Sequence, residues 1–319
     1  MPFLVRPFEE QDYESLVTIA NAIYPEHRKS TEEWRRNDQL FDEIRYVRLR
    51  YVAVDKETRR VVGYGSIQHS PGTFHPQKFW LILKVHPHWQ RKGVGRTIYE
   101  RLNAHLKELN AITVWTNIRE DHTDAFAFFE RRGFTEVRRE WELRLPVEEV
   151  DTASFLPVLE RVQEQGIVIV TLLEERERDR DYLRKVYELS DTILADVPMS
   201  DRWTGLSFEE FERQFNHPGL LPEAYFIAKH GDRYIGRSDL WRLEAEPDRL
   251  YQGITGVLRE YRRRGVATAL KVKTIEYAKQ HGYKLITTWN DSENVAMLSL
   301  NEKLGFRRQI GWVVMEKVL

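Results

Sequence analysis

Two six-residue stretches decide the fold of this 319-residue chain: Gln90-Arg91-Lys92-Gly93-Val94-Gly95 and Arg262-Arg263-Arg264-Gly265-Val266-Ala267. Each follows an apolar run typical of a strand and precedes an amphipathic run typical of a helix. Glycine lets a ligand approach the backbone, and the first turn of a helix offers free N–H groups with partial positive charge. Neighbouring Arg and Lys side chains add charge-assisted hydrogen bonds. The two stretches therefore predict turns that bind a phosphorylated ligand.

A wider repeat surrounds these turns. Gly93 and Gly265 are 172 residues apart, and so are Gly133 and Gly305, while Gly63 and Gly236 are 173 apart. Self-similarity at a fixed spacing indicates a duplicated structural unit. We therefore expect a first domain over residues 1–146, a connecting helix over 147–166 and a second domain over 167–319.

Each copy alternates strands and helices, as expected for an α/β protein with a mixed sheet. In the first copy the pattern predicts strands at 3–7, 51–55, 61–68, 79–85 and 112–116, a last strand ending near 145, and helices at 12–23, 95–109 and 124–131. In the second copy it predicts strands at 168–172, 225–229, 234–240, 251–257 and 284–288, and helices at 267–279 and 294–303.

Composition excludes several classes of protein. The 49 Lys and Arg residues nearly balance the 50 Asp and Glu residues, which argues against a nucleic-acid partner. The absence of Cys excludes disulfide scaffolds, Cys-ligated metals and thiol nucleophiles, and the scattered His residues show no metal-site spacing. No apolar run approaches the roughly 20 residues of a membrane helix, and Arg6 interrupts the N-terminal apolar run. We expect a soluble cytoplasmic protein without a membrane partner or a bound metal.

Two known phosphate motifs do not fit the turns. The chain contains no GxxxxGK[ST], and Gly95 is not followed by the third glycine of GxGxxG. The pattern [QR]-x-x-G-x-[GA] between a strand and a helix resembles the coenzyme A pyrophosphate loop of the GCN5-related N-acetyltransferases. That family also has N-x-x-A-x-x-x-[YF]-x-x-x-G-F near its C-terminus, and the copies end in related stretches at Gly133-Phe134 and Gly305-Phe306. The chain thus resembles two such domains in tandem.

The resemblance implies a mixed sheet of seven-stranded type, splayed between its fourth and fifth strands, with acetyl-CoA or another acyl-CoA as co-substrate. It also implies that Leu83–Val85 and Thr255–Val257 bind the pantetheine amides and that the two turns bind the pyrophosphate. By this reasoning the cofactor-binding residues are Leu83, Val85, Gln90, Arg91, Lys92, Gly93, Val94, Gly95, Thr255, Val257, Arg262, Arg263, Arg264, Gly265, Val266, Ala267 and Asn294.

The catalytic residues are not identified by sequence. The family's thiolate-protonating Tyr is replaced by Phe129 in the first copy and Asn301 in the second, and neither fourth strand carries a Glu. Candidates for acid or base work are Asn301, Asp239 and His86, with His88, Glu244 and Glu246 nearby in the sequence. The copies have diverged, which favours one active and one mainly structural domain, with the second copy expected to be active.

Two functions remain open from sequence. The favoured one is acetyl transfer to a primary amine of a small molecule, by direct attack in a ternary complex. The alternative is a non-catalytic acyl-CoA-binding sensor or assembly module. By analogy with the family, pairing of two domains within one chain would replace a homodimer and leave a monomer.

Overall fold

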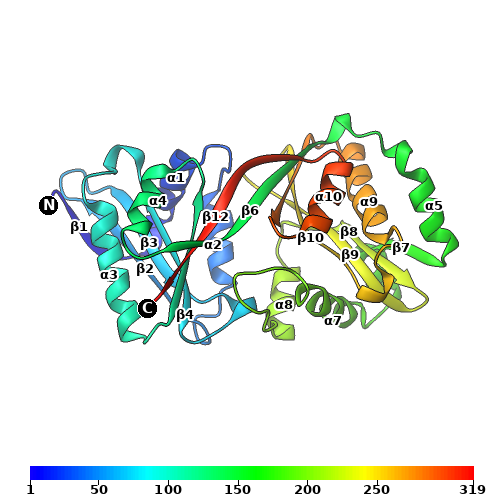
Figure 1. Ribbon diagram of the computed structural model, residues 1–319, viewed down its shortest axis with the longest axis horizontal. Coiled ribbons are helices and arrows are strands. Elements are labelled where there is room, and N and C mark those ends of the chain that lie inside the picture. Colours follow the sequence, from blue (N-terminus) through cyan, green and yellow to red (C-terminus); the bar gives the residue numbers. More distant parts are fainter. The chain divides into compact units, whose positions relative to one another are not determined.

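The chain folds into two units in the computed structural model, which describes residues 1–319 (Figure 1). Unit 1 consists of residues 1–138 and 313–319, and unit 2 consists of residues 139–312. The connecting segment 147–166 therefore lies wholly within unit 2, where it contains the predicted helix as α5 (Leu156–Glu164).

Unit 1 is a mixed sheet with helices on both faces, as predicted. Its strands follow the order β1-β2-β3-β4-β5-β12; the strands from β1 to β4 pair antiparallel, and β4 and β5 run parallel. The strands are β1 (Phe3–Pro7), β2 (Arg48–Asp55), β3 (Val61–Gln68), β4 (Lys78–Val85), β5 (Thr113–Arg119) and β12 (Arg307–Val318). The helices are α1 (Tyr13–Ile23), α2 (Thr31–Gln39), α3 (Val94–Glu108) and α4 (Thr123–Glu130).

Unit 2 repeats this arrangement in the order β6-β11-β10-β9-β8-β7, and again only one neighbouring pair, β10 with β11, is parallel. Its strands are β6 (Thr135–Pro146), β7 (Ile167–Thr171), β8 (Leu220–His230), β9 (Arg233–Arg242), β10 (Arg249–Val257) and β11 (Leu285–Asp291). Besides α5, its helices are α6 (Leu172–Arg178), α7 (Tyr182–Leu194), α8 (Phe208–Phe215), α9 (Val266–Gln280) and α10 (Val295–Lys303). The predicted ranges include no counterpart of α2, α7, α8 or β12.

Opposite faces of each sheet carry different helices. In unit 1, α3 packs so closely on β3 that an added Cβ at Gly63 or Gly65 would lie 2.8 Å or 2.7 Å from its side chains. Tyr64 points the other way, into a cluster with Leu16 of α1. In unit 2, α9 and α10 cover one face of the strands and α7 and α8 the other (Figure 1). No helix of the structure is both long enough and apolar enough to cross a membrane.

The last strand of each sequence copy completes the sheet of the other copy's unit. The buried side chains of Val313 and Met315, at the end of β12, belong to the core of unit 1. The buried side chains of Leu143 and Leu145, in β6, belong to the core of unit 2, where they pair with β11. We call this arrangement the strand exchange. Because of it, the units are divided at residues 138/139 and 312/313, whereas the sequence copies divide at 146.

Candidate functional site

The two turns have the same backbone conformation. Gly93 and Gly265, the N-caps of α3 and α9, have φ of +87° and +88°, and Arg91 and Arg263 both have φ of +62°. Positive φ strains a residue with a side chain, so glycine fits both N-cap positions. Alternation of left-handed and right-handed residues turns successive N–H groups toward one side and makes a concavity for an anion.

The N–H groups at these turns lack protein acceptors. No side chain caps α3 or α9, and the first inward hydrogen bonds are those from Thr97 to Gly93 and from Ala269 to Gly265. The N–H groups of residues 94–96 and 266–268 therefore have no acceptor in the fold and stand at the positive end of a 15-residue helix. A diphosphate supplies the negative oxygens that these groups need.

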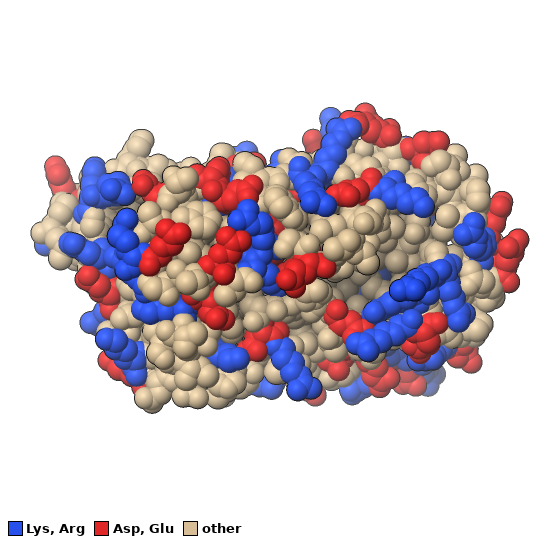
Figure 2. Space-filling model, in the orientation of Figure 1, with Lys and Arg blue, Asp and Glu red and all other residues tan.

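Charge around the second turn is denser than around the first. Arg259, Arg262, Arg263 and Arg264 are all exposed there, and Figure 2 shows Lys and Arg side chains gathered over this end of unit 2. Two of them hold Asp196, on the segment that follows α7: Arg262 approaches its carboxylate to 2.5 Å, and Arg259 also pairs with it. Hydrogen bonds from Arg259 lower the pKa of Asp196 to about 2, so the pair stays ionised at neutral pH.

The first residue of each turn stabilises the loop itself. The Gln90 side chain donates to the Val85 carbonyl at 3.2 Å, and Arg262 Nε donates to the Val257 carbonyl at 3.0 Å. Both side chains thus point back to the end of the preceding strand. Lys92 lies over the Trp89 ring and Arg264 over the Tyr261 ring, at 5.1 Å and 5.0 Å from the centroids. These contacts fix the turns without using the backbone N–H groups of the first helical turns.

Beside each turn the sheet forks. The parallel strands β4 and β5 pair only from Lys78 to Trp80, and β10 pairs with β11 only from Arg249 to Tyr251. Beyond these points the strands diverge, which leaves the facing edges of Leu83–Val85 and Thr255–Val257 without a strand partner. An extended chain carrying amides can pair with such an edge in β-like fashion. The four strand residues predicted to bind pantetheine therefore lie along the forks.

The two forks differ by one residue. Strand β10 pairs with β9 through Gln252 opposite Leu240 and then Thr255 opposite Ser238, so it holds one residue more than β9 over this stretch. Strand β4 pairs with β3 without interruption. Unit 2 thus has a β-bulge where unit 1 has a regular strand, and bulges are found beside active sites. The extra residue explains why Tyr251 is 171 residues after its counterpart Trp80, while Val257 is 172 after Val85.

Asp239 lies directly over this bulge. An added Cβ at Gly253 would overlap its Oδ2 atom. Its carboxylate accepts from Arg237 Nη2 at 2.7 Å and from Trp241 Nε1 at 2.6 Å, and the side chain is 1 % exposed. The sequence offered Asp239 as a candidate for acid or base work; the structure shows a buried, salt-bridged residue. With each oxygen occupied, Asp239 holds Trp241 and the bulge in place.

The α7 face of β10 and the α1 face of β4 carry different side chains. In β10 both residues on this face of the fork are glycines, Gly253 and Gly256, and Ile193 of α7 packs against Gly256. The equivalent residues of β4 are Ile82 and Lys84, judged by their pairing with β3. In unit 2 the side chains of Ile193 and Asp239 therefore lie directly on the strand backbone, while in unit 1 the strand carries two large side chains of its own.

The other predicted catalytic residues take local roles. His86 caps a short turn by accepting from the His88 N–H at 3.3 Å. Asn301 is fully buried and donates to Asn290 Oδ1 at 2.6 Å, while its own Oδ1 accepts nothing in the protein. Asn294, predicted to bind the cofactor, caps α10 by accepting from the Met297 N–H at 3.3 Å.

Sequence reasoning missed a polar cluster at the fork of unit 1. Lys84 Nζ donates to the Tyr24 hydroxyl at 2.7 Å, and the Tyr24 ring lies against Arg119 and stacks on His122. These residues come from the end of α1, from β4, from the end of β5 and from the cap of α4. No local pattern joins them, because the fold alone brings them together.

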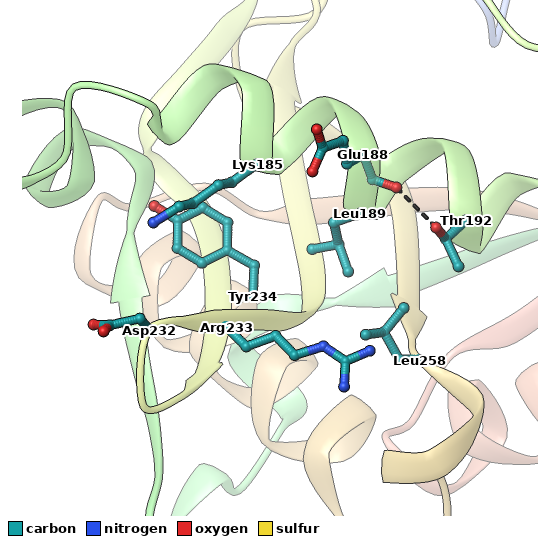
Figure 3. A pocket seen from close by; sticks show the side chains of 8 residues that line it. All are labelled: Lys185, Glu188, Leu189, Thr192, Asp232, Arg233, Tyr234 and Leu258. Atoms are coloured by element: carbon teal, nitrogen blue, oxygen red, sulfur yellow. Dashed lines mark hydrogen bonds between the residues drawn. The ribbon is translucent and has the colours of Figure 1, made fainter.

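A shallow pocket of about 330 Å³ lies away from the forks, between α7 and the hairpin of β8 and β9 (Figure 3). Lys185 lies beside Tyr234 at one end, and Arg233 extends toward Leu258 at the other. The pocket contains none of the predicted site residues. The structure also gathers no group of three or more His, Asp or Glu side chains that could hold a metal ion.

Comparisons with known proteins agree with this geometry. The family model described as "Acetyltransferase (GNAT) family" matches residues 13–134 and again residues 180–306. A mycothiol acetyltransferase of Thermobifida fusca is 25% identical over 275 residues, covering 81% of this chain and 80% of its own length. One from Salinispora arenicola is 24% identical, covering 84% of each chain.

Solved structures show the same fold over the whole chain. A tandem GNAT protein from the clavulanic acid biosynthesis pathway has a TM-score of 0.74 at 17% identity, covering 99% of this chain and 98% of its own. A GCN5-related N-acetyltransferase from Sphaerobacter thermophilus has a TM-score of 0.72 at 18% identity, covering 99% and 96%. The mixed α/β fold and the tandem repeat predicted from sequence are thereby confirmed.

Proposed function

The chain belongs to the GNAT acetyltransferase family in both of its halves, and from this we propose that it transfers the acetyl group of acetyl-CoA to a primary amine of a small molecule, with unit 2 as the catalytic unit. Membership makes it an N-acetyltransferase, and the family uses acetyl-CoA in general. The relatives named as mycothiol acetyltransferases support a small-molecule acceptor. The lack of Cys supports a reducing compartment such as the cytoplasm.

The observation that carries the proposal is the pairing of an anion-binding turn with an open fork, present in both units. The N–H groups of residues 94–96 and 266–268 fit a diphosphate, and the edges of β4 and β10 fit the amides of pantetheine. Acetyl-CoA supplies an acetyl thioester, which a neutral amine can attack. The protein's own task is to hold that thioester and the amine in reacting geometry.

The assignment of unit 2 rests on its fork. Gly253 and Gly256 let Asp239 and Ile193 lie directly on the backbone of β10, and the bulge beside them changes which backbone groups point into the fork. In unit 1, Ile82 and Lys84 occupy the matching face. The two forks therefore differ in shape, and only that of unit 2 has the bulge, a feature found beside active sites.

Asn301 supports the leaving group in this proposal. Its amide stands where the family places a tyrosine, and the equivalent residue of unit 1 is the apolar Phe129. An amide N–H donates a hydrogen bond to a thiolate without giving up a proton. In this scheme the nitrogen of the attacking amine gives its proton to water and the thiolate takes a proton from water, while Asp239 acts by positioning Trp241 and the bulge.

The experiment is calorimetric titration with acetyl-CoA, followed by an assay of thiol release with a panel of small amines. Gly93→Glu and Gly265→Glu each place a bulky negative side chain at one turn. We expect Gly93→Glu to lose acetyl-CoA binding in unit 1 and Gly265→Glu to lose it in unit 2. Gly265→Glu should abolish turnover, and Gly93→Glu should leave it. Gly133→Glu and Gly282→Glu are the controls, because both glycines also have positive φ but lie outside the turns.

Turnover that survives Gly265→Glu and disappears with Gly93→Glu would move catalysis to unit 1. Acetyl-CoA binding without thiol release across the whole panel would favour the alternative, a binding module without turnover. No binding to any variant or to the wild type would contradict the proposal.

A further inference from the structure

We propose that unit 1 acetylates its own Lys84, so that this side chain is a modification site for the acetyl group of a bound acyl-CoA. The inference rests on the proposed cofactor site of unit 1. It gives that unit a reaction of its own, with a side chain of the protein as the acceptor.

The position of Lys84 carries the argument. It lies on β4 between Leu83 and Val85, the two residues whose strand edge faces the fork. Gly93 follows nine residues after Lys84, so a cofactor held at that turn by its diphosphate extends its pantetheine along this strand. Lys84 thus carries its amine on the same strand along which the pantetheine and its thioester are expected to lie.

Unit 2 has no such amine. The residue equivalent to Lys84 by strand pairing is Gly256, and the side chain that packs on it is Ile193 of α7, whereas Lys84 meets Tyr24 at the end of α1. The lysine and its tyrosine partner therefore replace a glycine and an isoleucine together. A matched pair of changes at one contact indicates a specific arrangement at the fork of unit 1.

The surroundings of Lys84 suit a nucleophile. Burial lowers the pKa of its ammonium group to about 8, so a useful fraction is the neutral amine near neutral pH. The groups that face it are Tyr24 at the end of α1, Tyr64 across on β3, Arg119 and Asp121 at the end of β5, and His122 at the cap of α4. Burial lowers the pKa of His122 below its usual 6.5, so its ring is neutral and can accept a proton.

The reaction balances without another reagent. The lone pair of neutral Lys84 Nζ attacks the thioester carbonyl carbon, a C–N bond forms and the C–S bond breaks. His122 takes the proton that the nitrogen loses, and the thiolate recovers a proton from water. The products are N-acetyl-lysine at position 84 and free coenzyme A. The side chain loses its positive charge, which weakens its contact with Tyr24.

The test is incubation of the full chain with isotopically labelled acetyl-CoA, followed by digestion and mass spectrometry. We expect label at Lys84 to accumulate at least about tenfold faster than at the exposed Lys56 and Lys303. Between pH 7 and 9 the rate at Lys84 should rise about tenfold and then level off, whereas a surface lysine of ordinary pKa gains about a hundredfold.

Three variants sharpen the result. Lys84→Arg should remove the fast label and keep the charge, and Gly93→Glu should remove it by blocking the turn of unit 1. His122→Phe keeps the ring that stacks on Tyr24 and removes its nitrogens, so labelling should slow at least about tenfold. Amine turnover by unit 2 should be unchanged in His122→Phe.

The possible failures can be told apart. If calorimetry shows acetyl-CoA bound at unit 1 while Lys84 gains label no faster than Lys56, the inference is overturned and the proposed function stands. If Gly93→Glu changes neither binding nor labelling, unit 1 holds no cofactor, and both the inference and the site on which it rests are contradicted. An unchanged rate in His122→Phe rejects the proposed base.

Discussion

Lys271 shows how far a single residue departs from the usual rules of burial. It projects from α9, is 1 % exposed, and its Nζ lies 4.8 Å from the centre of the Phe306 ring while donating to the side-chain carbonyl of Gln252. Burial lowers the pKa of this lysine to about 7, against 10.5 for the free side chain. The folded protein therefore favours neutral Lys271, while the unfolded chain keeps it charged up to about pH 10.

This difference makes the stability of unit 2 rise with pH. Between pH 7 and 9 the unfolded state holds a proton that the folded state has released, so the free energy of unfolding should increase by up to about 1.4 kcal/mol per pH unit. In Lys271→Met this contribution disappears. Urea unfolding at pH 7, 8 and 9 should show a steeper rise for the wild type than for Lys271→Met. The exposed Lys303→Met is the control and should follow the wild type; parallel profiles for all three would contradict the prediction.

At the scale of one element, β10 differs from β4 by the residue that makes its bulge. Deleting Ile254 should restore regular pairing with β9 and bring unit 2 to the register of unit 1. We expect thiol release to fall by at least about a hundredfold, because the groups at the fork lose reacting geometry. Acetyl-CoA binding at the turn should weaken only a few-fold, since Gly265 and the first turn of α9 stay in place.

Acetyl-CoA binding and thiol release must be measured on the same variant, because only their difference separates a changed fork from an unfolded unit. Loss of binding and turnover together would show only that unit 2 no longer folds around its cofactor. If the variant without Ile254 kept full turnover, the bulge would play no part in the reaction. A regular strand such as β7, which lies at the edge of the sheet, offers a control deletion at its first residue, Ile167.

Local signals predicted the elements well and their partners only in part. The turns, the helices that follow them and the mixed sheet were all predicted, because glycine, capping and periodicity act within a few residues. The pairing of Lys84 with Tyr24 was not, since 60 residues separate the two. The strand exchange was also missed: β6 and the end of β12 are equivalent strands with the same alternation, so nothing local tells which sheet each will complete.

In the molecule as a whole, the strand exchange means that a mutation in the last strand of one sequence copy destabilises the unit built mainly from the other copy. Met315, four residues from the C-terminus, is 1 % exposed in the core of unit 1, and Leu143 is fully buried in the core of unit 2. Truncating either to Ala should destabilise its unit by about 2–5 kcal/mol. Met315→Ala should therefore raise amide hydrogen exchange within residues 1–138, and Leu143→Ala within residues 147–312.

Each variant serves as the control of the other in this experiment. The strand exchange would be contradicted if Met315→Ala raised amide hydrogen exchange in the second sequence copy and Leu143→Ala raised it in the first. The strand exchange also affects the sequence boundary at 146. A fragment of residues 1–146 would lack Val313 and Met315, which the end of β12 adds to the core of unit 1, so each variant should be measured in the full chain.

The strand exchange also reverses the order in which a ribosome could complete this protein. Chains emerge N-terminus first, and domains usually finish folding in that order. Here the sheet of unit 1 lacks its last strand until residues 313–319 leave the exit tunnel, although its first 138 residues are made early. Unit 2 needs nothing beyond residue 312. The half synthesised first is therefore the half that closes last, and until then the edge of β5 has no strand partner.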